Sequence, residues 1–203
     1  GCKNTTYRDK MPSCIDWCRY AEECVGQKRY GEHTMAKSVI LKEKIIKEME
    51  NYFGSDAKRI NHAKKVLKFA EELLRREEGD WHIVVPAGIL HDLGIKAAEQ
   101  KYGSASGCYQ EQEGPAIARK ILLGIGMKNE HIDEIAQIIA HHHTPGIINT
   151  HNFKILYDAD WLVNLKDEVE TRDPVKLKAA IDRIFLSRGG KRIAEEIYLK
   201  GGG

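Results

Sequence analysis

Apolar residues recur at helical spacing almost without interruption from Thr34 onward, and this periodicity constrains the fold more than any other feature. Residues that favour helix N-caps open most segments, and glycine or proline closes them. Strand-like alternation is missing, because the one β-branched run, 83–85, is short and lies among helix signals. We therefore predict an all-α chain with helices over 34–53, 55–78, 81–93, 111–123, 129–143, 153–169, 174–186 and 191–199.

Two features interrupt this helical pattern. Pro86 falls inside the third apolar segment, so that helix either begins at Pro86 or is kinked there. The stretch 98–110, AEQKYGSASGCYQ, is rich in small and polar residues and is predicted to form a loop.

Length and charge restrict the class of protein. A chain of 203 residues fits one domain with a sizeable core. No stretch approaches the ~18–20 apolar residues of a membrane span, and no signal peptide is recognisable, so we expect a soluble, cytoplasmic protein without a membrane partner. The chain has 32 Lys and Arg against 30 Asp and Glu, without a basic stripe. A nucleic-acid polymer is therefore not expected as a partner, whereas a homo-oligomer stays open.

His91 and Asp92 form the first candidate for chemistry. They follow the apolar run 87–90 at the end of a predicted buried helix. Adjacent helical residues point about 100° apart, so both side chains can face one point near the helix end. A neutral imidazole and a carboxylate are ligands that divalent transition metals accept. The alternative is a histidine at the negative end of the helix dipole, next to a solvated aspartate.

His62 strengthens the metal interpretation. On a helical wheel it lies within about 40° of Val66, Phe69 and Leu73, which places it at or near the buried face. A single histidine on an apolar face is more often a satisfied core residue. A second histidine on a neighbouring helix makes a shared site the better interpretation.

Asp160 is a further candidate metal ligand. It lies in a strongly apolar helix, 155–165, where a carboxylate is costly unless it is paired or bound to a metal. The wheel places Asp160 near Leu156 and Val163, while Asp158 leans toward Lys154 and the more polar side. We therefore favour Asp160 as the inward ligand. The alternative is a buried aspartate that caps another helix or pairs with an arginine.

The order His62, His91-Asp92, Asp160, with every member on a helix, resembles the HD-domain metal-dependent phosphohydrolases. His91-Asp92-Leu93-Gly94 resembles the family's HD-hydrophobic-Gly motif, and the run 159–162, ADWL, resembles its later Ala-Asp-x-Leu motif. The resemblance spans roughly residues 55–170. It implies a helical bundle of the HD-domain type that hydrolyses a phosphate ester, of a nucleotide or another phosphomonoester.

The resemblance also implies roles for particular residues. His62, His91, Asp92 and Asp160 would hold one divalent ion (Mn, Mg, Co, Ni, Fe or Zn), and Asp92 would also orient or deprotonate the attacking water. Lys96, which follows the motif, could contact the phosphate, although a surface lysine is an equally good interpretation. The substrate-binding candidates are Lys96, His141 and His142.

The sequence departs from the family members that bind two metals. Those members, including the HD-type di-iron oxygenases, place two further histidines between the HD pair and the last aspartate. No histidine lies in 109–114, where one would be expected, although Glu111 or Glu113 could replace it. The run His141 to His143 could supply the other, line the pocket, or lie on the surface. A single-metal hydrolase is favoured over a di-iron oxygenase.

The cysteines suggest a separate N-terminal segment. Four of the five lie within the first 24 residues, at Cys2, Cys14, Cys18 and Cys24. We predict a Cys-rich extension over 1–33 and an HD-type helical domain over 34–203. Cys14, Cys18 and Cys24 could bind zinc or an iron–sulfur cluster, or remain reduced thiols. A non-catalytic sensor of nucleotides or redox state is therefore a third possible function.

Overall fold

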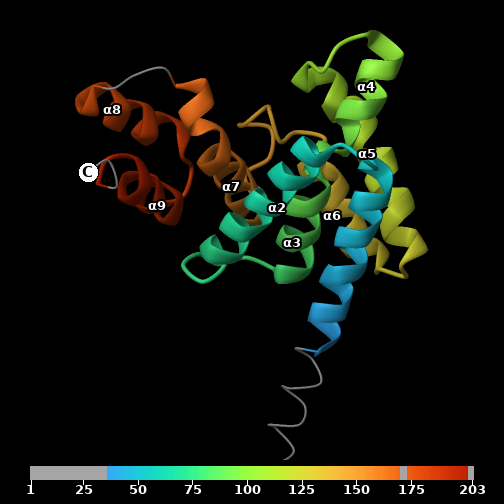
Figure 1. Cartoon of the computed structure of the whole chain (residues 1–203). Coiled ribbons are helices and arrows are strands. Elements are labelled where there is room, and N and C mark those ends of the chain that lie inside the picture. The colour runs from blue at the N-terminus through green and yellow to red at the C-terminus, as the bar shows by residue number, and fades with distance from the viewer. Residues whose placement is uncertain (1–35, 170–172, 201–203) are drawn as a thin grey trace, which may run out of the picture. The chain divides into compact units, whose positions relative to one another are not determined.

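The computed structural model describes residues 36–169 and 173–200. By its internal contacts the chain divides into two compact units, Gly1–Leu41 and Lys42–Gly203. Every regular element in the described ranges is a helix, so the all-α prediction is confirmed (Figure 1). No described helix is both long and apolar enough to cross a membrane. The predicted metal site at Cys14, Cys18 and Cys24 lies outside the described residues.

The helices follow the predicted order with some changed boundaries. Residues 36–53 are helical, and Gly54 ends this helix with a left-handed backbone, φ 63°. The remaining elements are α2 (Ala57–Leu73), α3 (Trp81–Leu90), the 3₁₀ helix η1 (His91–Leu93), α4 (Gly94–Tyr102), α5 (Gly107–Gly124), α6 (Asn129–Ile139), α7 (His151–Glu168), α8 (Pro174–Ile184) and α9 (Arg188–Tyr198).

Helix α3 lies at the centre of the bundle. It packs against α2, α6 and α7, and every residue from Ile83 to Leu90 is buried. A helix that is apolar on all sides needs neighbours on all sides, which explains this central position (Figure 1). Asp80 caps the first turn by accepting a hydrogen bond from the His82 amide, 2.8 Å. The helix therefore begins at Trp81, before Pro86, which it accommodates in its interior.

The predicted loop over 98–110 is wrong. Helix α4 runs to Tyr102 and α5 begins at Gly107, so only residues 103–106 separate them. Gly103, with φ 65°, ends α4, whereas Gly94, which resembled a helix stop, begins it. Gly94 serves close packing, because a Cβ atom there would fall on the backbone carbonyl of Gln110 in α5. Gly94 therefore reflects two helices in close approach, and the connection between them is confined to 103–106.

Helix α6 also ends earlier than predicted. Its last residue is Ile139, and His141 to His143 lie in the following turn. This turn places the three histidines near the end of α3, since α3 packs against α6. Helices α8 and α9 complete the unit by packing against each other, and α9 also packs against α7.

Candidate metal centre

Three segments that are distant in sequence bring four polar side chains together. His62 comes from α2, His91 and Asp92 from η1, and Asp160 from α7. His62 Nε2 lies 3.3 Å from His91 Nε2, 3.4 Å from Asp92 Oδ2 and 3.1 Å from Asp160 Oδ1. His91 Nε2 lies 3.5 Å from Asp92 Oδ2 and 3.6 Å from Asp160 Oδ1. Two imidazole nitrogens and two carboxylate oxygens therefore converge on one point.

Hydrogen bonds behind the cluster orient its members. His91 is fully buried, and its Nδ1 lies 3.0 Å from the Gly88 carbonyl oxygen. A carbonyl only accepts, so Nδ1 donates to it and Nε2 is the nitrogen that faces the cluster. Asn164, one turn after Asp160, donates from Nδ2 to Asp160 Oδ1 over 2.9 Å. Such outer contacts hold metal ligands in a fixed rotamer.

The electrostatics of the cluster suit a cation. Burial alone would raise the pKa of Asp92, but the nearby His91 lowers it to about 2. The pKa of Asp160 is also well below its usual range, because hydrogen bonds from His62 and His91 outweigh the effect of burial. Both carboxylates are therefore ionised at neutral pH. Asp92 and Asp160 are only 9% and 8% exposed, and two buried carboxylates require compensating positive charge.

The donor set fits a divalent transition metal. Ligand atoms of His62, His91 and Asp92 all lie within 4.8 Å of one another, and Asp160 Oδ1 is adjacent to both imidazoles. Imidazole and carboxylate together suit zinc, iron, manganese and related ions. The fixed tautomer of His91 and the bond from Asn164 to Asp160 add the second layer of contacts typical of a metal site.

A second group of possible ligands adjoins the first. Ligand atoms of Asp92, His142 and His143 also lie within 4.8 Å of one another. His142 is 3% exposed, and its Nδ1 lies 2.7 Å from the Ile139 carbonyl oxygen. Its Nε2 is the one buried side-chain nitrogen or oxygen in the described residues without a hydrogen-bond partner, 3.8 Å from Asp92 Oδ1. A buried polar atom without a partner is costly, which indicates a binding role.

A cavity of about 430 Å³ opens beside the cluster. Charged residues on its wall include Lys58 and Arg59 from α2. Arg59 NH1 lies 2.9 Å from Asp56 Oδ2, and NH2 lies 2.6 Å from Glu99 Oε1, which links α2 to α4. The complete lining is Asp56, Lys58, Arg59, His62, Asp92, Ile95, Glu99, Ala105, Gln110, His143, Asp160 and Asn164.

A family model for the HD domain matches residues 59–165, which is more than half of the chain and contains all four converging residues. The chain belongs to the HD domain family. With the four-residue cluster, this membership supports a metal-dependent hydrolase.

One solved structure resembles this HD domain, a predicted HD superfamily hydrolase from an uncultured Thermotogales bacterium. The two chains are 24% identical, with a TM-score of 0.59, over 78% of this chain and 86% of the other. This likeness concerns the fold. No curated protein matches the chain.

The other predicted site residues, Lys96, His141 and His142, do not line the cavity beside the cluster. His142 lies beside Asp92, whereas His141 is half-buried and does not line the cavity. Lys96 does not line it either, because its Nζ donates to the Tyr52 carbonyl oxygen over 3.0 Å and lies over the Tyr52 ring. The expectation that Asp158 faces the polar side is wrong, since Asp158 is fully buried.

Sequence reasoning missed several residues of the cavity wall. Arg59 lies three residues before His62, and Asn164 lies four after Asp160, so helical spacing alone could have identified both. Gln110 occupies the stretch in which two-metal members would carry a histidine, and its Oε1 lies 3.3 Å from His143 Nε2. That contact joins α5 to the turn after α6, and no pattern within one helix predicts it.

Proposed function

We propose that this HD domain is a single-metal phosphohydrolase that cleaves a phosphate ester of a nucleotide or another small phosphomonoester. The observation that carries the proposal is the convergence of His62, His91, Asp92 and Asp160 within the range that the HD domain model matches. These four residues would hold the ion. When bound, such an ion lowers the pKa of a coordinated water and polarises a phosphoryl oxygen. The Thermotogales structure, named a predicted hydrolase, supports this assignment.

Asp92 has the geometry for two tasks. Its Oδ2 faces His62 and His91 at 3.4 and 3.5 Å, while its Oδ1 faces His142 Nε2 at 3.8 Å. One oxygen can therefore serve the cluster while the other orients an attacking water or accepts its proton. The unpartnered nitrogen of His142 can hold that water from the other side or donate a proton to the leaving group.

The substrate phosphate would meet Lys58 and Arg59 on the cavity wall. Asp56 and Glu99 fix the guanidinium of Arg59, and a fixed guanidinium presents paired donors suited to phosphate oxygens. A contact between Lys96 and the phosphate remains a prediction. It requires the ammonium group to give up its hydrogen bond to the Tyr52 carbonyl oxygen. His141 likewise remains a prediction for the substrate, and it would have to turn toward the cavity.

The test combines metal analysis with an activity screen. Purified protein should contain close to one transition-metal ion per chain, and it should release phosphate from mixed nucleotides with Mn, Co, Ni or Mg. Asp92→Ala should lose both the metal and the activity while keeping a cooperative unfolding transition. Asp133→Ala, an exposed position on α6, is the matched control and should retain both. Full activity in Asp92→Ala would reject the proposal.

An HD-type di-iron oxygenase is the second candidate, and the group of Asp92, His142 and His143 favours it, since it could hold a second ion. The stretch 109–114, which contains no histidine, argues against it. Two irons per chain would support this candidate. A non-catalytic sensor would bind a nucleotide tightly without turnover under every metal tested, and its cysteine segment lies outside the described residues.

A further inference from the structure

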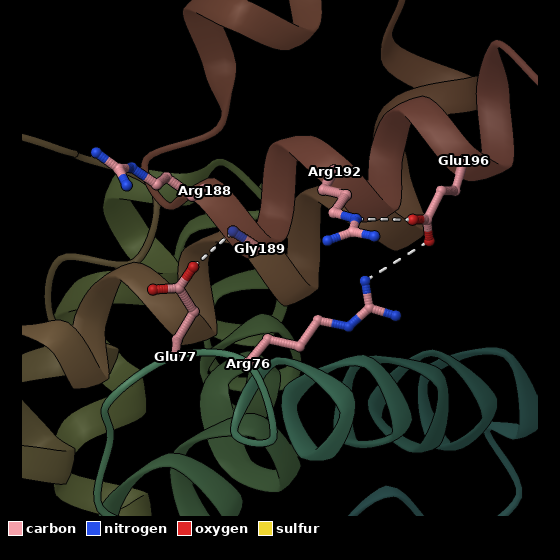
Figure 2. Close-up of a pocket in the computed structure, with 6 residues that line it drawn as sticks. All are labelled: Arg76, Glu77, Arg188, Gly189, Arg192 and Glu196. Carbon is pink, nitrogen blue, oxygen red and sulfur yellow. Dashed lines mark hydrogen bonds and ion pairs between the residues drawn. The ribbon is translucent and has the colours of Figure 1, made fainter.

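A second cavity, also about 430 Å³, lies between the turn that follows α2 and helix α9. Its wall contains three arginines, two glutamates and a glycine, and none of them belongs to the metal cluster (Figure 2). The lining residues are Arg76, Glu77, Arg188, Gly189, Arg192 and Glu196. Two segments more than 100 residues apart in sequence therefore bring three guanidinium groups to one cavity.

The two glutamates have different tasks. Glu77 Oε1 accepts a hydrogen bond from the Gly189 amide over 2.5 Å, so this carboxylate caps the first turn of α9. Glu196 lies between two arginines, with Oε1 3.1 Å from Arg192 Nε and Oε2 3.6 Å from Arg76 NH1. One carboxylate is therefore shared by two guanidinium groups that Figure 2 shows turned toward each other.

The arginines retain capacity for another anion. Arg76 also contacts Glu72, at 2.8 Å from NH2, but that glutamate lies outside the cavity wall. Arg188 has no ion pair or side-chain hydrogen bond in the described part of the chain and is exposed. In Figure 2 its guanidinium points away from Arg76 and Arg192, and an exposed arginine can turn toward the cavity by a rotamer change at little cost. The cavity wall carries three arginines and two glutamates, and one of the two carboxylates is committed to the backbone.

We propose that this cavity binds the phosphate groups of a small anion, with Arg192 and Arg188 as its main contacts and Arg76 at its edge. A guanidinium group can pair two of its N–H donors with two phosphate oxygens, and a solvent-exposed ion pair such as that of Arg192 with Glu196 is weak enough to be replaced. The anion would replace Glu196 between Arg76 and Arg192. This site is separate from the metal centre and does not depend on the proposed catalysis.

The same chemistry could come from free pyrophosphate or from the diphosphate of a nucleotide, and titrations distinguish the two. Pyrophosphate and adenosine diphosphate are titrated calorimetrically into the full chain, with backbone amide NMR signals of Gly189 and Gly190 as the local readout. Equal affinity for both indicates that the site recognises only the phosphates. A tighter complex with the nucleotide indicates that the cavity also holds the nucleoside, and both outcomes support the proposal.

Variants locate the binding. Arg188→Gln and Arg192→Gln should each weaken binding about tenfold, since each removes a charge-assisted contact. Glu196→Gln should tighten binding, because it removes the competing carboxylate. Arg183→Gln, on the exposed side of α8 and outside the cavity, is the matched control and should bind as the unmodified chain does. In His91→Ala, pyrophosphate should still shift the Gly189 and Gly190 amide signals, because these amides report on this cavity and not on the metal centre.

Three results would overturn the proposal. The first is the absence of any pyrophosphate binding at millimolar concentration and low ionic strength. The second is equal weakening by Arg183→Gln and Arg188→Gln, which would indicate a nonspecific charge effect. The third is loss of binding in His91→Ala with no change in Arg192→Gln, which would assign the anion to the metal centre.

Discussion

Asp158 and Asp160 lie two residues apart on α7, yet their carboxylates serve different parts of the molecule. Asp160 Oδ1 lies 3.1 Å from His62 Nε2, within the metal cluster. Asp158 accepts hydrogen bonds from the backbone amides of Leu186 and Ser187, each over 2.8 Å. Residues two apart on a helix point about 200° apart, so α7 carries the cluster on one side and anchors the α8–α9 connection on the other.

This division predicts opposite effects for two matched substitutions. Asp160→Asn should abolish stoichiometric metal binding and leave the metal-free chain folded, because it removes one anionic ligand. Asp158→Asn should retain the metal but lower the free energy of unfolding by about 1–3 kcal/mol, since its NH₂ group would face a backbone donor. Elemental analysis and urea unfolding of both metal-free variants provide the measurements. Loss of metal in Asp158→Asn with retention in Asp160→Asn would contradict the assignment.

Metal binding should release a proton from His91. Burial lowers the pKa of this histidine, but the neighbouring Asp92 and Asp160 raise it to about 9 in the metal-free chain. The imidazole is therefore protonated near neutral pH, whereas a metal ligand must be neutral. Metal affinity should therefore rise with pH. It should level off above the pKa of His91, where the imidazole is already neutral before the ion binds. Calorimetric titration with Zn near pH 7, in buffers of different ionisation enthalpy, should detect about one released proton per ion. Binding without proton release would refute the expectation.

Much of the metal centre could be predicted because its signals are local. His62 and Asp160 are polar residues on apolar helical faces, and His91-Asp92 follows a buried helix. Each of these patterns is visible within one or two turns. The burial of Asp158 could not be predicted this way, because its partners are backbone amides 28 and 29 residues away. A helical wheel shows which face of a helix is apolar. It does not show which of its side chains accepts hydrogen bonds from a distant segment.

One error in the predicted fold concerns the role of a glycine. Gly94 and Gly103 resemble two helix stops in sequence, but only Gly103 has the left-handed backbone of a stop. Gly94 keeps helical dihedrals and permits α4 and α5 to approach closely. A glycine required for close packing and a glycine required for a turn look alike until the neighbouring element is known.

The packing role of Gly94 predicts a strong effect for a small substitution. Gly94→Ala places a methyl group on the Gln110 carbonyl, so α4 and α5 must separate, at a cost of about 1–3 kcal/mol or more. Gly124→Ala at the end of α5 is the matched control, because its added methyl group meets no atom within 4 Å. It should be neutral or slightly stabilising. The measurement is the midpoint of thermal unfolding of both variants. Equal shifts of the two midpoints would disprove this reasoning.

Arg59 should affect substrate binding more than the chemical step. Arg59→Gln removes the fixed guanidinium from the cavity wall, so KM for a phosphate ester should rise about tenfold while kcat changes little. Arg119→Gln provides the control, since Arg119 is a half-buried residue of α5 whose ion pair with Asp133 lies outside the cavity. Steady-state kinetics at saturating metal separates the two constants. A fall in kcat with unchanged KM would argue against a binding role.

His142 decides between one metal and two. Its Nε2 is buried, has no hydrogen-bond partner and lies 3.8 Å from Asp92 Oδ1, so it can contact either a water or a second ion. In the single-metal hydrolase, His142→Ala should keep one ion per chain and lower kcat by about 10²-fold or more, as expected for loss of an acid–base group. His151→Ala, at an exposed position at the start of α7, is the control and should change neither quantity. A fall from two ions to one in His142→Ala would instead establish the second metal and favour the oxygenase.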